Sequence, residues 1–287
     1  IMVNVAQNPD GSWYATADNF ELGYVTITGT GALYSIGFNT NGFSYGWIHD
    51  CEISGWWIGV YMQGSDYVTV EYNTIHDTPW AAVMLWGDGT TYNTVYQNEI
   101  YDLERDGIVI WGAEWNLYTD DEGRYRALPP FDARGNTIAQ NVIDGTGAYN
   151  WNIAIGFVAG TAEDPINVHH NTITGGSQGI MATGMSKYVH IHENTISVVN
   201  QGILIWGEYN HVHHNTITIT SGTDHWAGIN VKLHWWLFYD PSVNNFIHHN
   251  TCNNIGIVTF YDQNNPGDNT WMKNKSTPPG AEDPHYE

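Results

Sequence analysis

The amino-acid sequence predicts an all-β, single-domain right-handed parallel β-helix of about eight to ten coils, each with three short strands. Two phrases recur in register along the chain and lead to this prediction. The first is Asn-x-Ile, and the second is Gly-Ile-x-Ile or a close variant, as in GIVIW and GILIW. Apolar and polar residues alternate with a period of two, which indicates strands, and no long helical pattern competes. The Asn of the first phrase falls at positions 73, 98, 141, 171, 194, 215, 250 and 274.

Each coil of about 22 residues contains the same elements in the same order. One strand leads to the Asn, and a tight bend at the Asn, which tolerates the left-handed region, joins it to a second strand. Stacked Asn side chains are expected to hydrogen-bond along the column. Gly-Ile-x-Ile forms the third strand, and its Ile and Val side chains point inward. No coil can bury its apolar face alone, so the coils must stack.

The repeat also predicts the boundaries and the state of the cysteines. We expect residues 45–276 to form the β-helix, residues 1–44 a cap or an irregular first coil, and residues 277–287 an irregular tail. Cys51 takes the place of the Asn in the first full coil, and Cys252 falls in the last. At about 4.8 Å per coil they are about 34 Å apart, which is beyond disulfide reach. The sequence therefore predicts two free, buried thiols.

The charge balance restricts the partners. The chain has 30 Asp and Glu residues against 8 Lys and Arg, a net charge of −22. This charge argues against nucleic acid and anionic membrane surfaces as partners. No apolar run reaches the roughly 18 residues that a membrane span requires. We expect a monomer with no nucleic-acid partner and no membrane partner.

The paired phrases resemble the parallel β-helix repeat of the pectate-lyase-like superfamily, over roughly residues 45–275. That superfamily holds lyases, glycoside hydrolases, epimerases, phage tailspikes and inert spacers, so the resemblance implies the fold more sharply than the activity. It implies a carbohydrate-active protein, extracellular or at the cell surface, whose substrate groove lies over the Gly-Ile-x-Ile strands. A narrower resemblance is to the β-helical catalytic unit of archaeal disaggregatases, which cut the matrix polysaccharide of methanogen aggregates.

Insertions enter the repeat on both sides of the Gly-Ile-x-Ile strand. They follow this strand near residues 113–134, 157–165 and 234–244, and they precede it near 144–151 and 218–227. Because loops on a rigid scaffold carry function, we interpret these insertions as the walls of a groove along the axis. The alternative is that insertions accumulate at a corner that tolerates them.

Strict alternation along the third strand predicts the groove floor. If Ile108 and Ile110 point inward, then Gly107, Val109 and Trp111 point outward. By this rule, the inner outward positions of successive strands are Tyr61, Met84, Val109, Ala154, Met181, Leu204, Asn230 and Val258. The final outward positions are Gln63, Trp86, Trp111, Gly156, Thr183, Trp206, Lys232 and Phe260.

Three tryptophans therefore share one outward column. We interpret Trp86, Trp111 and Trp206 as platforms on which sugar rings stack, with an open space at Gly156 and Thr183 between them. The alternative is that each Trp packs under an inserted loop, and Trp111 is the one expected to be most covered.

Several carboxylates border this floor. Glycoside hydrolysis needs two carboxyl groups about 5–10 Å apart. Glu208 follows a Trp-Gly phrase, as do Asp88 and Glu114, and it borders the predicted open space. Asp164 faces it from a loop, and Asp106 and Asp224 come from the opposite wall. We take Glu208, Asp164 and Asp106 as the catalytic candidates; the alternative for each is a solvated surface carboxylate.

The few cations supply further candidates. Lys232 occupies an outward floor position, where it could bind a uronate carboxylate or act as a base, unless it is an ordinary surface lysine. The other substrate-binding candidates are Asn230, His234, Trp235, Arg105 and Arg124.

Two features resemble metal sites. His169, His192, His213 and His248 share one outward position in successive coils, with His190 and His211 beside them. We interpret them as a surface ladder of neutral imidazoles rather than as metal ligands. The acidic stretch at residues 119–123 could bind Ca²⁺ through oxygen ligands, but an exposed acidic loop is favoured, so no cofactor is predicted apart from this Ca²⁺ option.

The sequence thus predicts an extracellular enzyme that degrades polysaccharide. We favour an endo-acting glycoside hydrolase on an acidic or amino-sugar matrix polysaccharide, because acidic groups outnumber candidate bases. One alternative is a lyase that acts on uronates by β-elimination with Lys232 or His234 as base. The other is a non-catalytic carbohydrate-binding or surface-structural β-helix.

Overall fold

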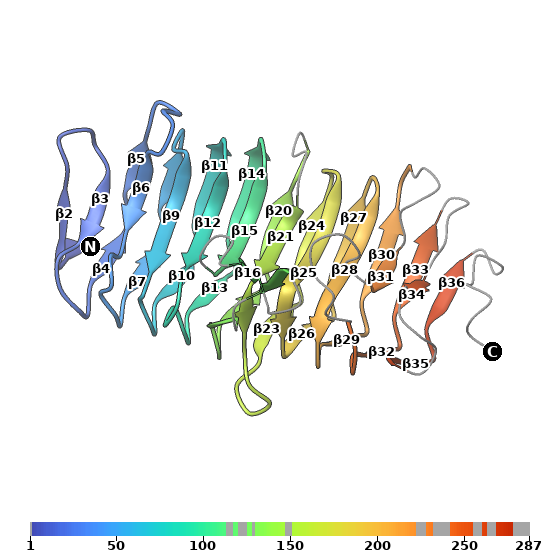
Figure 1. The fold of residues 1–287 in the computed structure, drawn as a ribbon. Helices are drawn as coiled ribbons and strands as arrows, with labels where there is room; N and C mark the ends of the chain where they lie inside the picture. Colours follow the sequence, from blue (N-terminus) through green and yellow to red (C-terminus); the bar gives the residue numbers. More distant parts are fainter. Residues whose placement is uncertain are drawn as a thin grey trace.

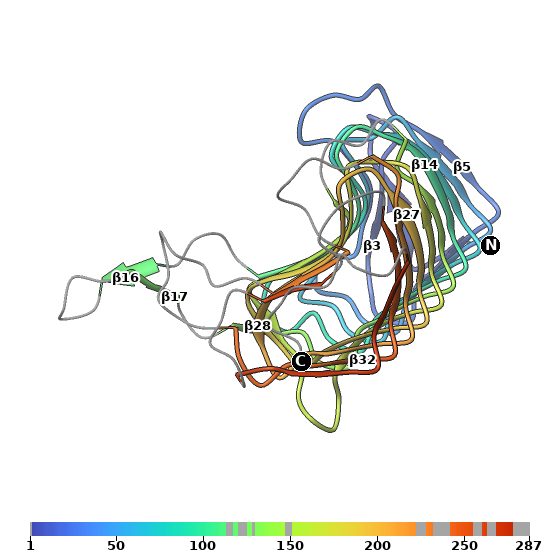
Figure 2. The ribbon, with the colours of Figure 1, turned by 90° about the vertical axis from the view of Figure 1, so that its right-hand side faces the viewer.

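The computed structural model describes residues 2–112, 117–119, 125–127, 130–146, 151–221, 228–231, 242–254, 260–262 and 268–277. Within these residues the chain is all-β, and it contains no helix of the length and apolarity that a membrane crossing requires. The strands stack into three long sheets, A, B and C, that run the length of the molecule (Figure 1), and a view along the stack shows the coils superposed (Figure 2). The predicted parallel β-helix is confirmed.

Each coil passes through sheet A, then sheet C, then sheet B. Sheet A contains β1 (Met2–Val3), β4 (Glu21–Gly23), β7 (Trp47–His49), β10 (Thr69–Glu71), β13 (Thr94–Tyr96), β19 (Thr137–Ala139), β23 (Ile166–His169), β26 (Val189–His192), β29 (His211–His213), β32 (Phe246–His248) and β35 (Thr270–Met272). Sheet C contains β5 (Thr26–Thr28), β8 (Glu52–Ser54), β11 (Thr74–Thr78), β14 (Glu99–Leu103), β20 (Val142–Asp144), β24 (Thr172–Thr174), β27 (Thr195–Val198), β30 (Thr216–Ile219), β33 (Thr251–Asn254) and β36 (Lys275–Thr277).

Sheet B holds the Gly-Ile-x-Ile strands. It contains β2 (Val5–Gln7), β3 (Trp13–Ala15), β6 (Ile36–Asn39), β9 (Ile58–Gln63), β12 (Ala81–Trp86), β15 (Asp106–Trp111), β21 (Trp151–Gly156), β25 (Gln178–Lys187), β28 (Gln201–Glu208), β31 (Ile229–Val231) and β34 (Phe260–Asp262), with β18 (Phe131–Asp132) and β22 (Val158–Ala159) beside it. A separate hairpin pairs β16 (Leu117–Thr119) with β17 (Tyr125–Ala127).

The first strands differ from the rest. β1 pairs antiparallel with β4, and β2 pairs antiparallel with β3. By contrast, β4, β5 and β6 pair in parallel with β7, β8 and β9 of the next coil. Parallel stacking of all three sheets therefore begins at Glu21, ahead of residue 45.

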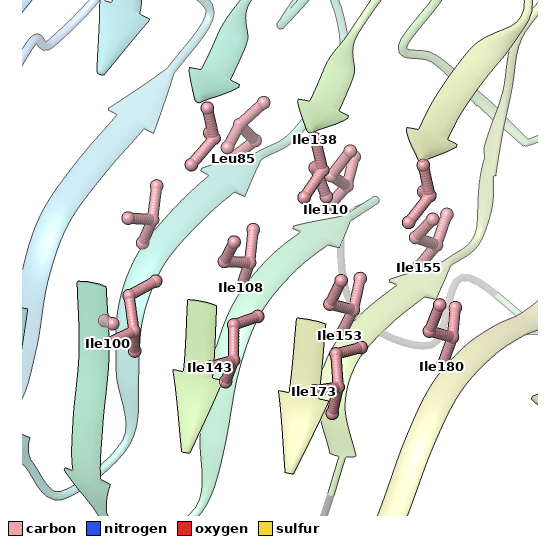
Figure 3. Close-up of a cluster of buried hydrophobic side chains, with 14 of the residues drawn as sticks. Leu85, Ile100, Ile108, Ile110, Ile138, Ile143, Ile153, Ile155, Ile173 and Ile180 are labelled. Carbon is pink, nitrogen blue, oxygen red and sulfur yellow. The ribbon is translucent and has the colours of Figure 1, made fainter. Parts of the chain in front are cut away.

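Stacked aliphatic side chains fill the interior. Ile108 and Ile110 of β15 pair with Ile153 and Ile155 of β21, and all four point inward (Figure 3). They are at most 1% exposed and belong to one cluster that runs from Ala15 to Phe260. Burying one such side chain contributes about 1.5–3 kcal/mol. Since each side chain is covered by the coils above and below it, stacking stabilises every coil.

The predicted Asn column is confirmed as a hydrogen-bonded ladder. In each coil the backbone N–H and Nδ2 of the Asn donate to Oδ1 of the Asn in the next coil, at 2.9–3.0 Å. The ladder links Asn73, Asn98, Asn141, Asn171, Asn194, Asn215, Asn250 and Asn274, and the N–H of Cys51 donates to its first member.

The predicted position of the bend is wrong by one residue. The residue before each ladder Asn has a positive φ, as at Tyr72, Gln97 and His170, and the Asn does not. The physical reason is that the Asn side chain must point inward to reach the next coil. The preceding residue makes the turn, and its side chain points to solvent.

A second ladder, which the sequence reading missed, lies at the corner between sheets B and A. Asn93 donates to Asn136, and further along Asn210 donates to Asn245, which donates to Asn269. Each stands five residues before an Asn of the first ladder, so the spacing Asn-x4-Asn would have revealed it.

Both cysteines are free and buried, as predicted. Burial raises the pKa of the Cys51 thiol and also that of Cys252. Because the thiolate is the reactive form, we expect a thiol-specific disulfide reagent to label neither cysteine in the native chain and both after denaturation. Rapid labelling of the folded chain would contradict this arrangement.

Candidate functional site

The outer face of sheet B carries an apolar and aromatic cluster that is separate from the interior. Its buried members are Ile58, Ala81, Met84, Val109, Trp151, Ala154 and Leu204, and the half-buried side chains against them include Trp57, Tyr61, Trp80, Trp86, Trp111 and Met181. Most of these side chains occupy positions that the sequence predicted for the outward rows of the sheet B strands.

The register confirms most of the predicted rows. Tyr61, Met84, Val109, Ala154, Met181, Leu204 and Asn230 pair successively across sheet B. Gln63, Trp86, Trp111, Gly156 and Thr183 form the second row in the same way. Trp86 and Trp111 are therefore neighbours about 4.8 Å apart at the backbone.

The second row breaks after Thr183. Ala182 pairs with Ile205, but the next pair is Ser186 with Gly207, so β25 bulges between them. Trp206 follows this break and is only 8% exposed, whereas Trp86 and Trp111 are half-buried. The prediction that Trp111 is the most covered of the three tryptophans is therefore wrong.

The end of the floor also differs from the prediction. Phe260 pairs with Ile229 and lies in the interior cluster, so its predicted outward position is wrong. Tyr261 stands opposite Asn230 instead, in the row predicted for Val258. Insertions of unequal length precede these strands, and they shift the register that a fixed repeat would give.

The predicted open space between the platforms is filled. A Cβ at Gly156 would lie 2.4 Å from the Trp111 ring, so the indole lies directly against this glycine. Phe157 packs edge-on against the same indole, with ring centroids 5.4 Å apart. Thr183 is also buried. Trp111 thus extends over the next coil, which closes the gap that small residues suggested.

A third outward row was missed, because alternation fails where sheet C meets sheet B. A Cβ at Gly107 would lie 2.5 Å from the carbonyl oxygen of Asn152 and 3.3 Å from the Ile143 side chain. Gly107 therefore faces the interior, contrary to the prediction, and only glycine fits. The residue before it faces outward, and this row contains Ile58, Ala81, Asp106, Trp151, Gln178 and Gln201.

Asp106 and Arg105, both predicted site residues, lie together at the start of β15. Asp106 is 4% exposed, and its carboxylate lies 3.2 Å from Arg105 Nε and accepts the N–H of Trp151 at 3.2 Å. The Arg105 guanidinium lies 5.7 Å above the Trp80 ring. The ion pair and the hydrogen bond offset the cost of burying this carboxylate.

Glu208 and Asp164 have different partners. Glu208 ends β28 and pairs with Lys187 of β25 at 3.1 Å. Asp164 accepts a hydrogen bond from the Tyr92 hydroxyl at 3.0 Å, which raises the pKa of Tyr92. Asp88, the other described carboxylate of the Trp-Gly phrase, accepts the N–H of Asp132 at 2.9 Å.

Geometry separates Asp106 from Glu208. Asp106 shares its row with Gln201, the first residue of β28, and Glu208 is the last residue of the same strand. At about 3.3 Å per residue, the two carboxylates lie at opposite ends of the sheet B strands, more than about 20 Å apart. They cannot form the pair that hydrolysis requires.

Two buried amides on the same face have free polar atoms. Three buried atoms have no hydrogen-bond partner among the described residues: Nε2 and Oε1 of Gln201 and Oδ1 of Asn230. Both side chains are at most 1% exposed. A buried amide without partners costs about 1–3 kcal/mol, and both side chains stand in outward rows of sheet B. Asn230 was predicted; Gln201 was missed together with its row.

The remaining predicted residues lie outside the described residues. They are Lys232, His234, Trp235 and Arg124, with Glu114, Asp224 and most of the acidic stretch at 119–123. Much of the predicted groove wall falls there too. Their roles stay predictions.

Comparison with known proteins places this geometry in context. The family model described as "Right handed beta helix region" matches residues 3–122 and 36–196. A mutant of the tailspike protein of E. coli bacteriophage HK620, solved in complex with a pentasaccharide, matches with a TM-score of 0.68 and 10% identity, over 92% of this chain and 50% of that one.

The catalytic domain of a GH87 alpha-1,3-glucanase, solved in complex with nigerose, matches with a TM-score of 0.55 and 12% identity. The match covers 94% of this chain and 56% of that one, so the chain spans about half the length of these solved structures. No curated protein matches the chain. At these identities the likeness to the solved structures shows the fold alone. The family match covers well over half of the 287 residues, and the chain belongs to the family of right-handed β-helix proteins.

Proposed function

We propose that this chain binds and cleaves polysaccharide, with the glycan lying over the outer face of sheet B. The observation that carries the proposal is the composition of that face. Half-buried indoles of Trp86 and Trp111 lie in register, and Asp106, Gln201 and Asn230 supply buried polar groups elsewhere in the outward rows of the same face. The apolar faces of sugar rings stack on indoles, and their hydroxyls need polar partners.

The solved structures of similar fold support this choice. One holds a pentasaccharide and one holds nigerose. We extend the proposal to an acidic or amino-sugar matrix polysaccharide, met outside the cell or at its surface. Arg105 and Lys187 lie at opposite ends of the sheet B strands, each paired with a carboxylate of this chain, and an acidic sugar would compete with Asp106 or Glu208 for them.

The proposed reaction is hydrolysis of a glycosidic bond. One carboxyl group protonates the leaving oxygen, a second takes a proton from water, and the remaining hydroxyl adds to the anomeric carbon. Because Asp106 and Glu208 are too far apart to act together, each is tested by itself as a member of such a pair.

Product analysis tests the activity. The chain is incubated with acidic and amino-sugar polysaccharides, and reducing ends and near-ultraviolet absorbance are followed together. New reducing ends without absorbance support hydrolysis, whereas absorbance from unsaturated uronates indicates the lyase alternative.

If Asp106 is the acid or base, Asp106→Asn lowers the rate at least about 100-fold. Glu208→Gln is the parallel test at the other edge. Full activity in both variants would exclude these residues.

The aromatic floor predicts an effect on binding alone. Trp86→Ala and Trp111→Ala should each weaken polysaccharide binding about tenfold, since stacking of a sugar ring on a half-buried indole contributes roughly 1.4 kcal/mol. The matched control is Trp47→Ala, a 41% exposed tryptophan on the outer face of sheet A. Affinity electrophoresis in polysaccharide gels measures the change. Equal losses in all three variants would place the glycan elsewhere.

A second candidate function is a glycan-binding module without catalysis. Its specific support is that Asp106, Glu208 and Asp164 all have partners that a structural role explains. Retention on the polysaccharide without any cleavage product would decide for it.

A further inference from the structure

The outer face of sheet A carries a long array of imidazoles that the proposed function does not use. His169, His192, His213 and His248 stack in successive coils, with ring centroids 4.9–5.0 Å apart and planes within 10° of parallel. This confirms that the four imidazoles stack in register, as the sequence predicted. A second column follows it at the corner to sheet C and contains His170, Glu193, His214 and His249.

Glu193 is the exception in this second column, because the other three positions hold histidine. Its Oε2 lies 3.3 Å from Nε2 of His170, in the preceding coil, and 3.1 Å from Nδ1 of His192. The three residues thus offer two imidazole nitrogens and one carboxylate oxygen, all within 4.8 Å of one another.

These separations suit a metal ion. In a tetrahedral site with bonds of about 2.0–2.1 Å, ligand atoms lie roughly 3.3 Å from each other. Two of the three separations, 3.1 and 3.3 Å, match this spacing, and the 3.1 Å contact is also a hydrogen bond between His192 and Glu193. The third separation, between the two imidazole nitrogens, is at most 4.8 Å. His170 and Glu193 are about half exposed, so a water molecule can reach the fourth position.

The neighbouring His169 supplies the support that metal-binding histidines usually have. Nδ1 of His170 lies 2.9 Å from Nδ1 of His169. If His170 donates this hydrogen bond, its proton is on Nδ1, and the lone pair of Nε2 is directed at Glu193. In that tautomer, one hydrogen bond holds the ring orientation and leaves Nε2 able to bind a cation.

Other parts of the array are less suited to a cation. Nε2 of His211 lies 2.6 Å from Nε2 of His248, so these nitrogens bond to each other. Burial and the nearby charge of Lys273 both lower the pKa of His249, and that charge would also repel a metal ion. Only at Glu193, among the described residues of the array, does a carboxylate join two imidazoles.

We propose that His170, His192 and Glu193 form a binding site for a divalent transition metal such as Zn²⁺, with His169 as a positioning residue. Imidazole nitrogen favours zinc and its neighbours over Ca²⁺ or Mg²⁺, which take oxygen ligands. The site joins two coils on sheet A, away from the floor on sheet B, and is independent of the proposed function.

The proposal is tested by titrating Zn²⁺ into the full chain after treatment with a chelator. Calorimetry at neutral pH measures the heat of binding. We expect a saturable site whose affinity falls at least about tenfold in His170→Ala and in Glu193→Gln. His169→Ala should weaken binding to a smaller extent. His249→Ala removes the imidazole equivalent to His170 three coils further along and should leave the affinity unchanged. Co²⁺ bound in the same site should give the visible absorption of a tetrahedral complex, which Glu193→Gln should alter.

Two results would overturn the proposal. One is the absence of saturable Zn²⁺ binding to the wild-type chain. The other is binding that persists in His170→Ala and Glu193→Gln but is lost in His249→Ala, which would assign the metal to another part of the array. Since His170 and Glu193 are half exposed, and Gln has the shape of Glu, circular dichroism should show that both variants stay folded.

Discussion

Replacing Asn171 by Ala is expected to lower the free energy of unfolding by about 3–5 kcal/mol. Nδ2 of Asn171 donates to Asn194 Oδ1 and to the carbonyl oxygen of Ile138. Its Oδ1 accepts both the backbone N–H and Nδ2 of Asn141. All of these atoms are buried, so the truncation leaves donors and acceptors that water cannot reach.

The matched control is Asn167→Ala in the same coil. Asn167 is half-buried and its side chain makes a single hydrogen bond, to the carbonyl oxygen of Pro165. We expect this change to cost less than about 1 kcal/mol. Denaturant unfolding followed by circular dichroism measures both variants. Similar losses in the two would mean that the ladder adds little beyond the strand pairing.

Acidification is expected to destabilise the chain through the imidazole stack. Burial lowers the pKa of His213 to about 3 and those of His211 and His248 to about 4. In the unfolded chain their pKa is about 6.5. The unfolded state therefore binds more protons, and stability falls as the pH drops from about 6.5 to about 4. Above pH 6.5 both states are neutral at these sites and the effect disappears.

A stacking residue that does not titrate separates this effect from the many carboxylates. His213→Phe keeps an aromatic ring in the stack, as Phe246 does beside His211 at 5.1 Å. Melting temperatures are measured for both chains from neutral pH to about pH 4. The wild type should lose more stability than the variant across this range. Parallel curves would show that protonation of His213 is not coupled to unfolding.

The repeated parts of the fold could be predicted from the sequence. The inward Ile column, the Asn ladder and the free cysteines follow from one local rule applied in every coil. The positive φ before each ladder Asn did not follow, since the repeat marks the position of the bend only to within one residue.

The candidate site could be predicted only in part. The rows of Trp86 and Asn230 were confirmed, because alternation holds in the middle of a strand. The row of Asp106 was missed, because Gly107 faces the interior at the corner.

The sequence by itself determined the β-helix, its inward face and the aromatic stripe on sheet B, because these repeat with the coil and need only local spacing. Only the tertiary structure decided that Trp111 covers Gly156, that Glu208 pairs with Lys187 and that Glu193 lies between two imidazoles. The Trp111–Gly156, Glu208–Lys187 and Glu193–His170 contacts each join different coils. Their geometry depends on which residues stack across a single strand spacing of about 4.8 Å, and insertions of unequal length hide that neighbourhood from the linear order.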